Sequence, residues 1–228
     1  MRYKFLLCFI GISNLIFSQI NYNKSTWTIK GNATSLFDIF TFPTVQLSIE
    51  KILTNHLSLS SEAGYQFYDF RRTDTTFLDP KGFKVNFECR YYFYKLFNTR
   101  ISKNSAKLYT GLRPFYRQNQ YTASIPYQTK FDPVNWKDDD FGVKNNSYGL
   151  YYIFGFQQSL SDRLLFDFHG GVGVIKRTIK NIELQYNKDS GDILGGTDLI
   201  QFFETFHLNE SSGLWGSFLF GIRIGYRL

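Results

Sequence analysis

The sequence predicts an all-β protein, an eight-stranded antiparallel up-and-down transmembrane β-barrel. Three observations lead to this fold. Apolar and polar residues alternate along most of the chain, the connections between the alternating segments are short and long in turn, and aromatic residues make up 19% of the 228 residues. Side chains of a β-strand point to opposite faces with period two, and aromatic residues favour strands. No segment between these stretches has the 3.6-residue period of an amphipathic helix.

The N-terminal residues have the layout of an export signal. A basic start precedes a mostly apolar run up to Phe17, and the small residue Ser18 is followed by a polar stretch. This order is typical of a cleaved secretory signal peptide, and the apolar run is too short to span a membrane. We therefore expect a signal peptide at 1–18 and a barrel domain at 19–228. Only Cys89 remains after cleavage, so no internal disulfide is expected.

The segment 83–93 is the clearest strand. Its odd positions are apolar or aromatic, whereas Lys84, Glu88 and Arg90 occupy even positions. One face of this strand is therefore apolar and the other is charged. The same alternation predicts seven more strands, at 26–35, 43–52, 57–70, 106–119, 147–159, 163–177 and 218–228.

The connections carry a second pattern. Short or modest links alternate with long ones after the first hairpin, as expected of outer-membrane barrels, which have short periplasmic turns and long external loops. This pattern places both termini on the periplasmic side. The short or modest links are 53–56, 98–105 and 160–162, and the long ones are 71–81, 121–146 and 178–213.

Two closed barrels fit the alternation, and they are inside-out versions of each other. A soluble lipocalin-like carrier would bury the apolar face, whereas a membrane barrel exposes it to lipid. The polar faces contain Gly and Ser and few charges per strand, unlike a solvated surface, which favours the membrane. Tyrosines that gather at strand ends favour it as well, because tyrosine prefers the membrane–water interface. These tyrosines are Tyr91, Tyr92, Tyr94, Tyr148, Tyr151 and Tyr152.

The final strand, FLFGIRIGYRL at 218–228, and the aromatic-rich hairpin segment 82–94 resemble the small eight-stranded outer-membrane barrels of Gram-negative bacteria. That superfamily includes barrels like outer membrane proteins A, X and W, together with uncharacterised members. The resemblance covers the whole exported chain. It implies an integral outer-membrane protein that contacts lipid and lipopolysaccharide, and a terminal strand read by the barrel-insertion machinery. The usual terminal aromatic residue is Leu228 here.

An eight-stranded barrel is just wide enough for side chains to fill its lumen. Unpaired charges are costly to bury, so the inward polar faces predict a plugged lumen cross-linked by acid–base pairs. The expected set contains more bases than acids and leaves room for a bound anion. Its members are Lys30, Glu50, Glu62, Lys84, Glu88, Arg90, Arg113, Asp167, His169, Arg223 and Arg227.

Catalytic chemistry has one candidate group. Asp167 and His169 share a strand face and could meet Ser58 or Ser60, which would suit a lipid-modifying enzyme of the outer leaflet, a deacylase or an acyltransferase. The alternative is a hydrogen-bonded lumen network, so we assign no catalytic residue and expect no enzyme.

The acidic run 138–140 could hold a divalent cation or be a solvated loop. No metal-ligand cluster is recognisable, and no cofactor is expected. Basic residues alternate along strands and form no patch, so nucleic-acid binding is not expected.

The expected role is structural or interactive: membrane integrity, adhesion, or an accessory subunit of a larger envelope complex. A protein partner would bind the aromatic patches of the two longest loops. The candidate contact residues are Tyr121, Tyr127, Phe131, Trp136, Phe202, Phe203 and Phe206.

Overall fold

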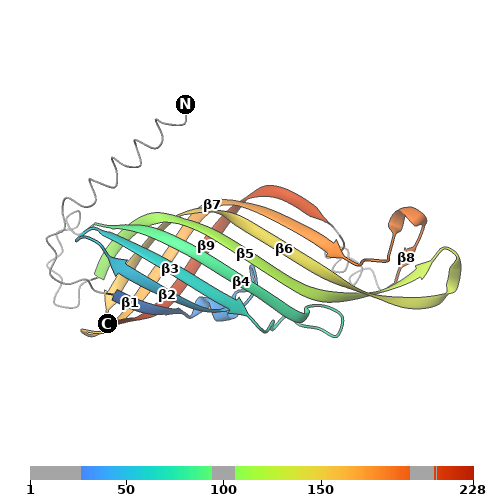
Figure 1. The fold of residues 1–228 in the computed structure, drawn as a ribbon, viewed down its shortest axis with the longest axis horizontal. Helices are drawn as coiled ribbons and strands as arrows, with labels where there is room; N and C mark the ends of the chain where they lie inside the picture. Colours follow the sequence, from blue (N-terminus) through green and yellow to red (C-terminus); the bar gives the residue numbers. More distant parts are fainter. Residues whose placement is uncertain (1–26, 94–105, 196–207, 209) are drawn as a thin grey trace, which may run out of the picture.

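A computed structural model describes residues 27–93, 106–195, 208 and 210–228 of the chain. The fold prediction is confirmed: eight antiparallel strands form a closed up-and-down barrel, and a two-residue strand, β8, is added at one end (Figure 1). The strands are β1 (Trp27–Asn32), β2 (Val45–Ile52), β3 (Leu57–Gln66), β4 (Leu78–Tyr92), β5 (Ala106–Thr129), β6 (Asp132–Ser159), β7 (Leu164–Ile182), β8 (Ile193–Leu194) and β9 (Ser211–Arg227).

One pairing between strands distant in the sequence closes the ring. The last strand returns to the first, because β9 pairs with β1 from Thr28↔Arg227 to Asn32↔Arg223. On the opposite side β4 pairs with β5, and this pairing includes Tyr92↔Tyr109. The six other pairings of the ring join strands that are neighbours in the sequence or, for β7 and β9, separated only by β8 and its flanking loops.

The segment 121–146 is not a loop, in contrast to the prediction. β5 and β6 continue through it as one long hairpin, with Tyr121 opposite Val143 and a turn after Thr129. This hairpin projects beyond the rest of the barrel, and β8 pairs with its β5 strand (Figure 1). Apolar side chains on its inner face form a separate buried cluster. Its members are Tyr121, Ala123, Ile125, Phe141, Val143 and Ile179.

β1 is the shortest barrel strand within the described residues, with 6 residues against 8 in β2 and 10 in β3. After Asn32 the chain turns into the 3₁₀ helix η1 (Thr34–Phe37). The Ser35 hydroxyl donates to Asn32 O at 2.7 Å and lies 2.9 Å from Thr44 O, so it ties the two ends of the segment 33–44 together. A second 3₁₀ helix, η2 (Lys188–Ser190), lies in the long connection between β7 and β9.

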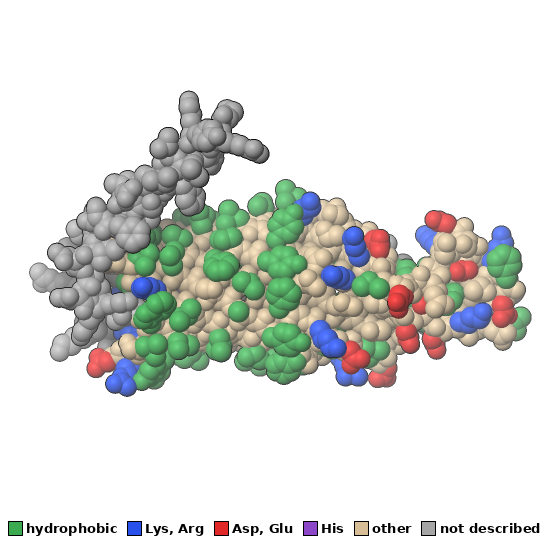
Figure 2. All heavy atoms as spheres, in the orientation of Figure 1, with side chains coloured by type: hydrophobic (Ala, Val, Ile, Leu, Met, Phe, Trp, Pro, Cys, Tyr) green, Lys and Arg blue, Asp and Glu red, His purple; other side chains and the backbone are tan. Residues whose placement is uncertain are grey.

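The two faces of the barrel wall have opposite polarity. Apolar side chains such as Leu47, Phe87 and Phe154, which are 62%, 57% and 56% exposed, point outward. They form a broad apolar zone around the barrel, and charged side chains gather at its ends and on the projecting hairpin (Figure 2). The inward face carries buried polar and charged residues. No helix within the described ranges is long and apolar enough to cross a membrane.

The predicted girdle of tyrosines is right only in part. Tyr91, Tyr148 and Tyr152 are about half exposed on the outer face. Tyr92 and Tyr151 instead point into the barrel and are buried, because they occupy the inward positions of their strands. Tyr94 lies outside the described residues.

Candidate functional site

Most of the buried charges of the barrel lie together in one group, which we call the lumen charge network. Seven strands contribute to it, and each member is at most 4% exposed. The strands place these side chains inside because each occupies an inward position of the period-two pattern. The network consists of Lys30, Glu50, Glu62, Glu88, Arg90, Arg113, Asp167, His169 and Arg223.

Asp167 joins strands from opposite sides of the ring. Its Oδ2 atom accepts from Lys30 Nζ at 2.5 Å and from Arg90 Nη1 at 2.7 Å. Its Oδ1 atom accepts from the Tyr109 hydroxyl at 2.6 Å. Three strands, β1, β4 and β5, are thereby tied to β7 through one carboxylate.

A second centre is formed by two glutamates and two arginines. Arg223 donates from Nε to Glu62 Oε2 at 2.6 Å and from Nη2 to Glu88 Oε1 at 2.5 Å. Arg113 Nη2 donates to Glu62 Oε1 at 2.8 Å. Arg90 Nε donates to Glu88 Oε2 at 2.7 Å and so links this centre to Asp167. Charge-assisted bonds of this length are stronger than neutral hydrogen bonds.

Glu50 completes the network with two cationic partners, Lys30 and, at 3.6 Å, Arg90, and with uncharged partners on other strands. Its Oε2 atom lies 2.6 Å from Lys30 Nζ. Its Oε1 atom accepts from the hydroxyls of Ser58 at 2.5 Å and Tyr92 at 2.7 Å. Both tyrosines stand at inward positions of the alternation, but the predicted charge network did not include the Tyr92 and Tyr109 hydroxyls as hydrogen-bond donors.

The network is balanced in charge, in contrast to the predicted excess of bases. Four cationic side chains face four carboxylates. Lys84 instead donates to Asp38 Oδ2 at 2.8 Å, at the end away from the termini. Arg227 lies at the opposite end and donates to Ser159 Oγ at 2.5 Å. The surplus that suggested a bound anion is therefore outside the network.

Asp38 is a loop residue that the sequence did not single out. Its carboxylate accepts from Thr41 N at 2.9 Å as well as from Lys84. Burial raises the pKa of this carboxyl, but the Lys84 ammonium and the hydrogen bonds from Lys84 and Thr41 outweigh burial, so the pKa lies below its ordinary value of 3.8. The carboxylate therefore stays charged and holds the segment 33–44 against β4.

The candidate catalytic group is not assembled as a triad. Ser58 donates to Glu50, and Asp167 binds Lys30, Arg90 and Tyr109. His169 Nε2 lies 3.0 Å from Arg113 Nη1. Arginine can only donate, so this ring nitrogen accepts and the imidazole is neutral. An acceptor occupied by arginine is not placed to take a proton from a serine.

An aromatic and aliphatic cluster adjoins the charges inside the barrel. The alternation places these residues inward. Gly173 makes room for one of them, since a Cβ at this position would lie 2.7 Å from Tyr151 Cδ1. The cluster contains Tyr92, Tyr109, Phe115, Tyr151, Ile153 and Ile175.

The acidic run 138–140 does not converge on a common point. Asp138 and Asp140 are exposed, whereas Asp139 is buried and its Oδ2 atom accepts from Gln185 N at 2.7 Å and Tyr186 N at 2.8 Å. Asp139 thus fastens the segment after β7 to the long hairpin. Across the part of the chain that the structure describes, no group of three or more metal-binding side chains is found.

The predicted loop contacts divide into three sets. Tyr121 and Tyr127 are buried on the inner face of the hairpin, so their assignment as exposed contact residues is wrong. Phe131 and Trp136 are 94% and 54% exposed near the hairpin tip. Phe202, Phe203 and Phe206 lie outside the described residues.

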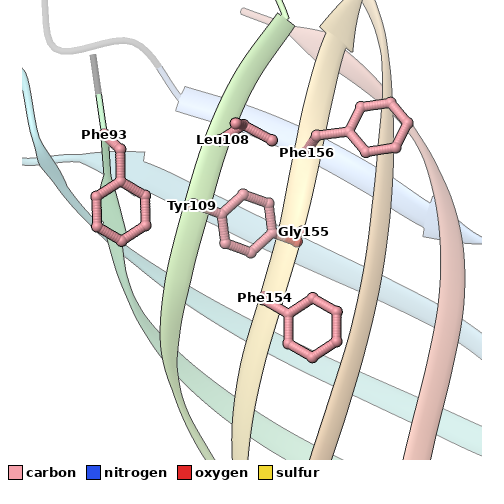
Figure 3. A pocket seen from close by; sticks show the side chains of 6 residues that line it. All are labelled: Phe93, Leu108, Tyr109, Phe154, Gly155 and Phe156. Carbon is pink, nitrogen blue, oxygen red and sulfur yellow. The ribbon is translucent and has the colours of Figure 1, made fainter. Parts of the chain in front are cut away.

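A notch of about 290 Å³ lies near the end that carries the termini (Figure 3). The Tyr109 hydroxyl is the only ionisable group in its lining, and it is already bonded to Asp167. The notch therefore offers no chemistry of its own. It is lined by Phe93, Leu108, Tyr109, Phe154, Gly155 and Phe156.

Comparison with known proteins identifies the family of the chain and a solved barrel domain that matches it. One solved structure that matches is the N-terminal β-barrel domain of Pseudomonas aeruginosa OprF, with 10% identity over 90% of this chain and 98% of that chain, and a TM-score of 0.33. No curated protein sequence matches. The sequence profile of the family described as "Protein of unknown function (DUF3575)" matches residues 5–193, which is most of the chain. The chain therefore belongs to the DUF3575 family.

Proposed function

We propose that this protein is an integral outer-membrane barrel with a plugged lumen, which anchors a projecting β-hairpin as a binding surface at the cell exterior. Its role is structural or adhesive, or that of an accessory subunit in an envelope complex, and it includes no catalysis. Export by a cleaved signal peptide, insertion through the C-terminal strand, and contact with lipid and lipopolysaccharide belong to the same proposal.

The observation that carries the proposal is the reversed polarity of the wall. Exposed Phe, Leu, Ile and Val side chains surround the barrel, while ion pairs fill its interior. In water this arrangement would leave a large apolar surface uncovered, which monomeric soluble proteins avoid. In a bilayer the acyl chains cover that surface, and the closed barrel satisfies its backbone groups internally.

The lumen charge network supports a plug. Arg90 and Arg223 cross the interior and bond carboxylates from other strands, and both guanidinium groups are fully buried. An ion entering this region would have to displace charge-assisted bonds on several strands at once. We therefore expect purified protein in a planar bilayer to show no steady conductance. A steady, large conductance would overturn the plug but leave the membrane assignment standing.

The hairpin tip supports the interaction role. Phe131, Val134 and Trp136 are exposed there, together with Ile193 of β8. Figure 2 shows that the projecting part of the molecule extends beyond the apolar zone of the barrel. Large apolar side chains on a projecting, water-facing element are typical of binding surfaces. On the inner side of the hairpin, the rings of Tyr127 and Tyr186 pack edge to face with their centres 6.2 Å apart. This contact stiffens the hairpin.

The proposed protein partner of the hairpin tip can be tested by comparing the proteins that co-purify from native outer membranes with the unchanged chain and with variants of the tip. A Phe131→Ser/Trp136→Ser chain should lose a co-purifying protein that the unchanged chain retains after detergent extraction. Asn135→Ser is the matched control, because Asn135 is an exposed polar residue of the same tip. All three proteins should keep a heat-sensitive mobility shift in gels. Identical sets of co-purifying proteins would contradict the role of the tip.

A further inference from the structure

The barrel wall has an unpaired strand edge on one side. β9 pairs with β7 along nearly its whole length, from Ile179↔Ser211 to Leu164↔Tyr226. On its other side β9 pairs with β1 only from Arg223 to Arg227, because β1 ends at Asn32. Figure 1 shows the short β1 in blue and the longer β9 in red. Among the residues that the structure describes, residues 211–221 of β9 therefore have no neighbouring strand on the β1 side.

The hydrogen-bond pattern identifies the backbone groups on this edge. Ala33 N donates to Ile222 O at 2.9 Å, so even-numbered residues of β9 direct their backbone groups toward β1. Arg227 N donates to Arg163 O, so odd-numbered residues face β7. By this alternation Phe220, Phe218 and Gly216 point their N–H and C=O groups into the gap. Within the described residues these groups have no hydrogen-bond partner.

The gap is open to the outside and bordered by apolar side chains. Phe218 is 86% exposed on β9, and the exposed Phe37 belongs to η1, which packs against β9. Trp215 stands on the inward face with Ser217, yet it is 61% exposed. Among the described residues, no strand lies beside Trp215 on the β1 side.

The edge lies at the depth of the apolar zone, and this makes it unusual. Phe218 is opposite Val172, and Phe220 is opposite Gly170, whose neighbour on β6 is Phe154; Val172 and Phe154 are both exposed on the outer face. Open sheet edges do not occur in hydrocarbon, because the backbone groups would lose their hydrogen bonds. Acyl chains cannot replace these bonds, and the polar headgroups of lipids lie nearer the interface.

A second copy of the chain does not fit the edge. All copies cross the membrane in the same direction, so two β9 edges cannot pair antiparallel. Parallel pairing of two identical edges needs a two-fold axis along the strands, and this axis would place the lipid face of one copy beside the lumen face of the other. A different polypeptide has neither restriction.

We propose that the edge of β9 at residues 216–220 accepts an extended segment of a partner membrane protein, which adds one strand to the barrel wall. The inference rests on the membrane location in the proposed function and names the partner's binding mode. The bound segment brings its own N–H and C=O groups at strand spacing. Its side chains are apolar on the side that meets lipid, and small or polar on the side facing Ser217 and Trp215.

The test is site-specific photo-cross-linking in intact cells, with a photoreactive phenylalanine at position 218, 220 or 154. Phe154 is the control, because it is exposed in the apolar zone at the centre of the sheet. We expect adducts with another polypeptide at 218 and 220, identified by mass spectrometry, and adducts with lipid alone at 154. The inference would be overturned by adducts with lipid alone at all three positions, or by one polypeptide captured at all three. It would also be overturned by a cross-link within the chain or to a second copy.

A proline variant tests the hydrogen bonds themselves. Gly216→Pro removes an N–H on the gap side and leaves the bonds to β7, and a Cβ at this position meets nothing within 4 Å. It should reduce the adduct at position 220 at least about tenfold, whereas Gly216→Ala should not. An undiminished adduct in a folded Gly216→Pro chain would overturn the inference. If Gly216→Pro does not fold, the adducts formed at positions 218, 220 and 154 of the otherwise unchanged chain test the inference. Absence of lipid adducts at 154 would instead refute the membrane location.

Discussion

Arg90 on β4 and Asp167 on β7 are joined by a hydrogen bond of 2.7 Å across the interior of the barrel, although 77 residues separate them. Their strands are not neighbours in the ring, since β5 and β6 lie between them. Arg90 also donates to Glu88, and its guanidinium lies 4.5 Å from the centre of the Tyr109 ring. One side chain thus holds together charges from different parts of the sequence.

Replacing Arg90 should be among the most destabilising changes in the chain. Arg90→Met leaves Asp167 and Glu88 with fewer partners while they remain buried, and losing one member of a buried ion pair costs about 3–5 kcal/mol. The free energy of unfolding can be measured by urea titration in lipid vesicles. Lys137→Met, on the exposed hairpin, is the control and should change stability by less than about 0.5 kcal/mol. Equal stability of the two variants would contradict a structural role for the network.

Gly155 on β6 should be required for the position of Tyr109. A Cβ at residue 155 would lie 2.7 Å from Tyr109 Cζ and Oη, so a larger residue must displace the ring that donates to Asp167. We expect Gly155→Val to destabilise the barrel by about 1–3 kcal/mol. The Val side chain would also meet Phe168 O, so part of this cost is independent of Tyr109.

A double-mutant cycle separates the two parts. In a Tyr109→Ala background the ring is absent, so the additional cost of Gly155→Val should be smaller than in the original chain. Unfolding in urea would again be the measurement. Strict additivity would show that Gly155 serves the backbone contact with β7 and not the Tyr109–Asp167 bond.

The alternation of side chains predicted which residues face the lumen, because period two follows from strand geometry alone. The alternation could not predict how far along the barrel axis each of these residues lies. Lys84 and Arg227 have the correct parity but lie at opposite ends of the barrel, away from the network. The pairing of Lys30 with Asp167 spans 137 residues and depends on the register of every strand between them, which no local pattern contains.

The long hairpin could have been found from the sequence. Tyr121, Ala123, Ile125 and Tyr127 continue the alternation of β5 without a break. Pro126 is unusual inside a strand, and membrane strands need only about 10 residues. Both features favour a strand that ends before the hairpin. The charged run beginning at Asp138 also suggested a loop, whereas one of its carboxylates is an internal hydrogen-bond acceptor.

Asp139 should be required for order in the segment that follows β7. Its carboxylate accepts from the amides of Gln185 and Tyr186, and hydrogen bonds to charged groups contribute about 1.5–3 kcal/mol each. Asp139→Ala should therefore speed hydrogen exchange at these two amides by at least about tenfold. Asp138→Ala, at an exposed neighbouring position, is the control and should leave both rates unchanged. The same acceleration in both variants would point to loss of negative charge as the cause.

The attachment of the segment 33–44 should persist in mild acid. The pKa of Asp38 is lowered by Lys84 and Thr41 although burial opposes them, so its stabilising contribution is complete above about pH 4 and is lost as the pH falls through the lowered value. We expect the Thr41 amide, which donates to Asp38 Oδ1, to remain protected from hydrogen exchange at pH 4.5 and to lose protection only well below 3.8, after allowance for the intrinsic exchange rate. Asp38→Asn should lower this protection at every pH and abolish its acid dependence. Loss of protection already between pH 5 and 4 in the unchanged chain would show that the Lys84–Asp38 pair does not hold the segment.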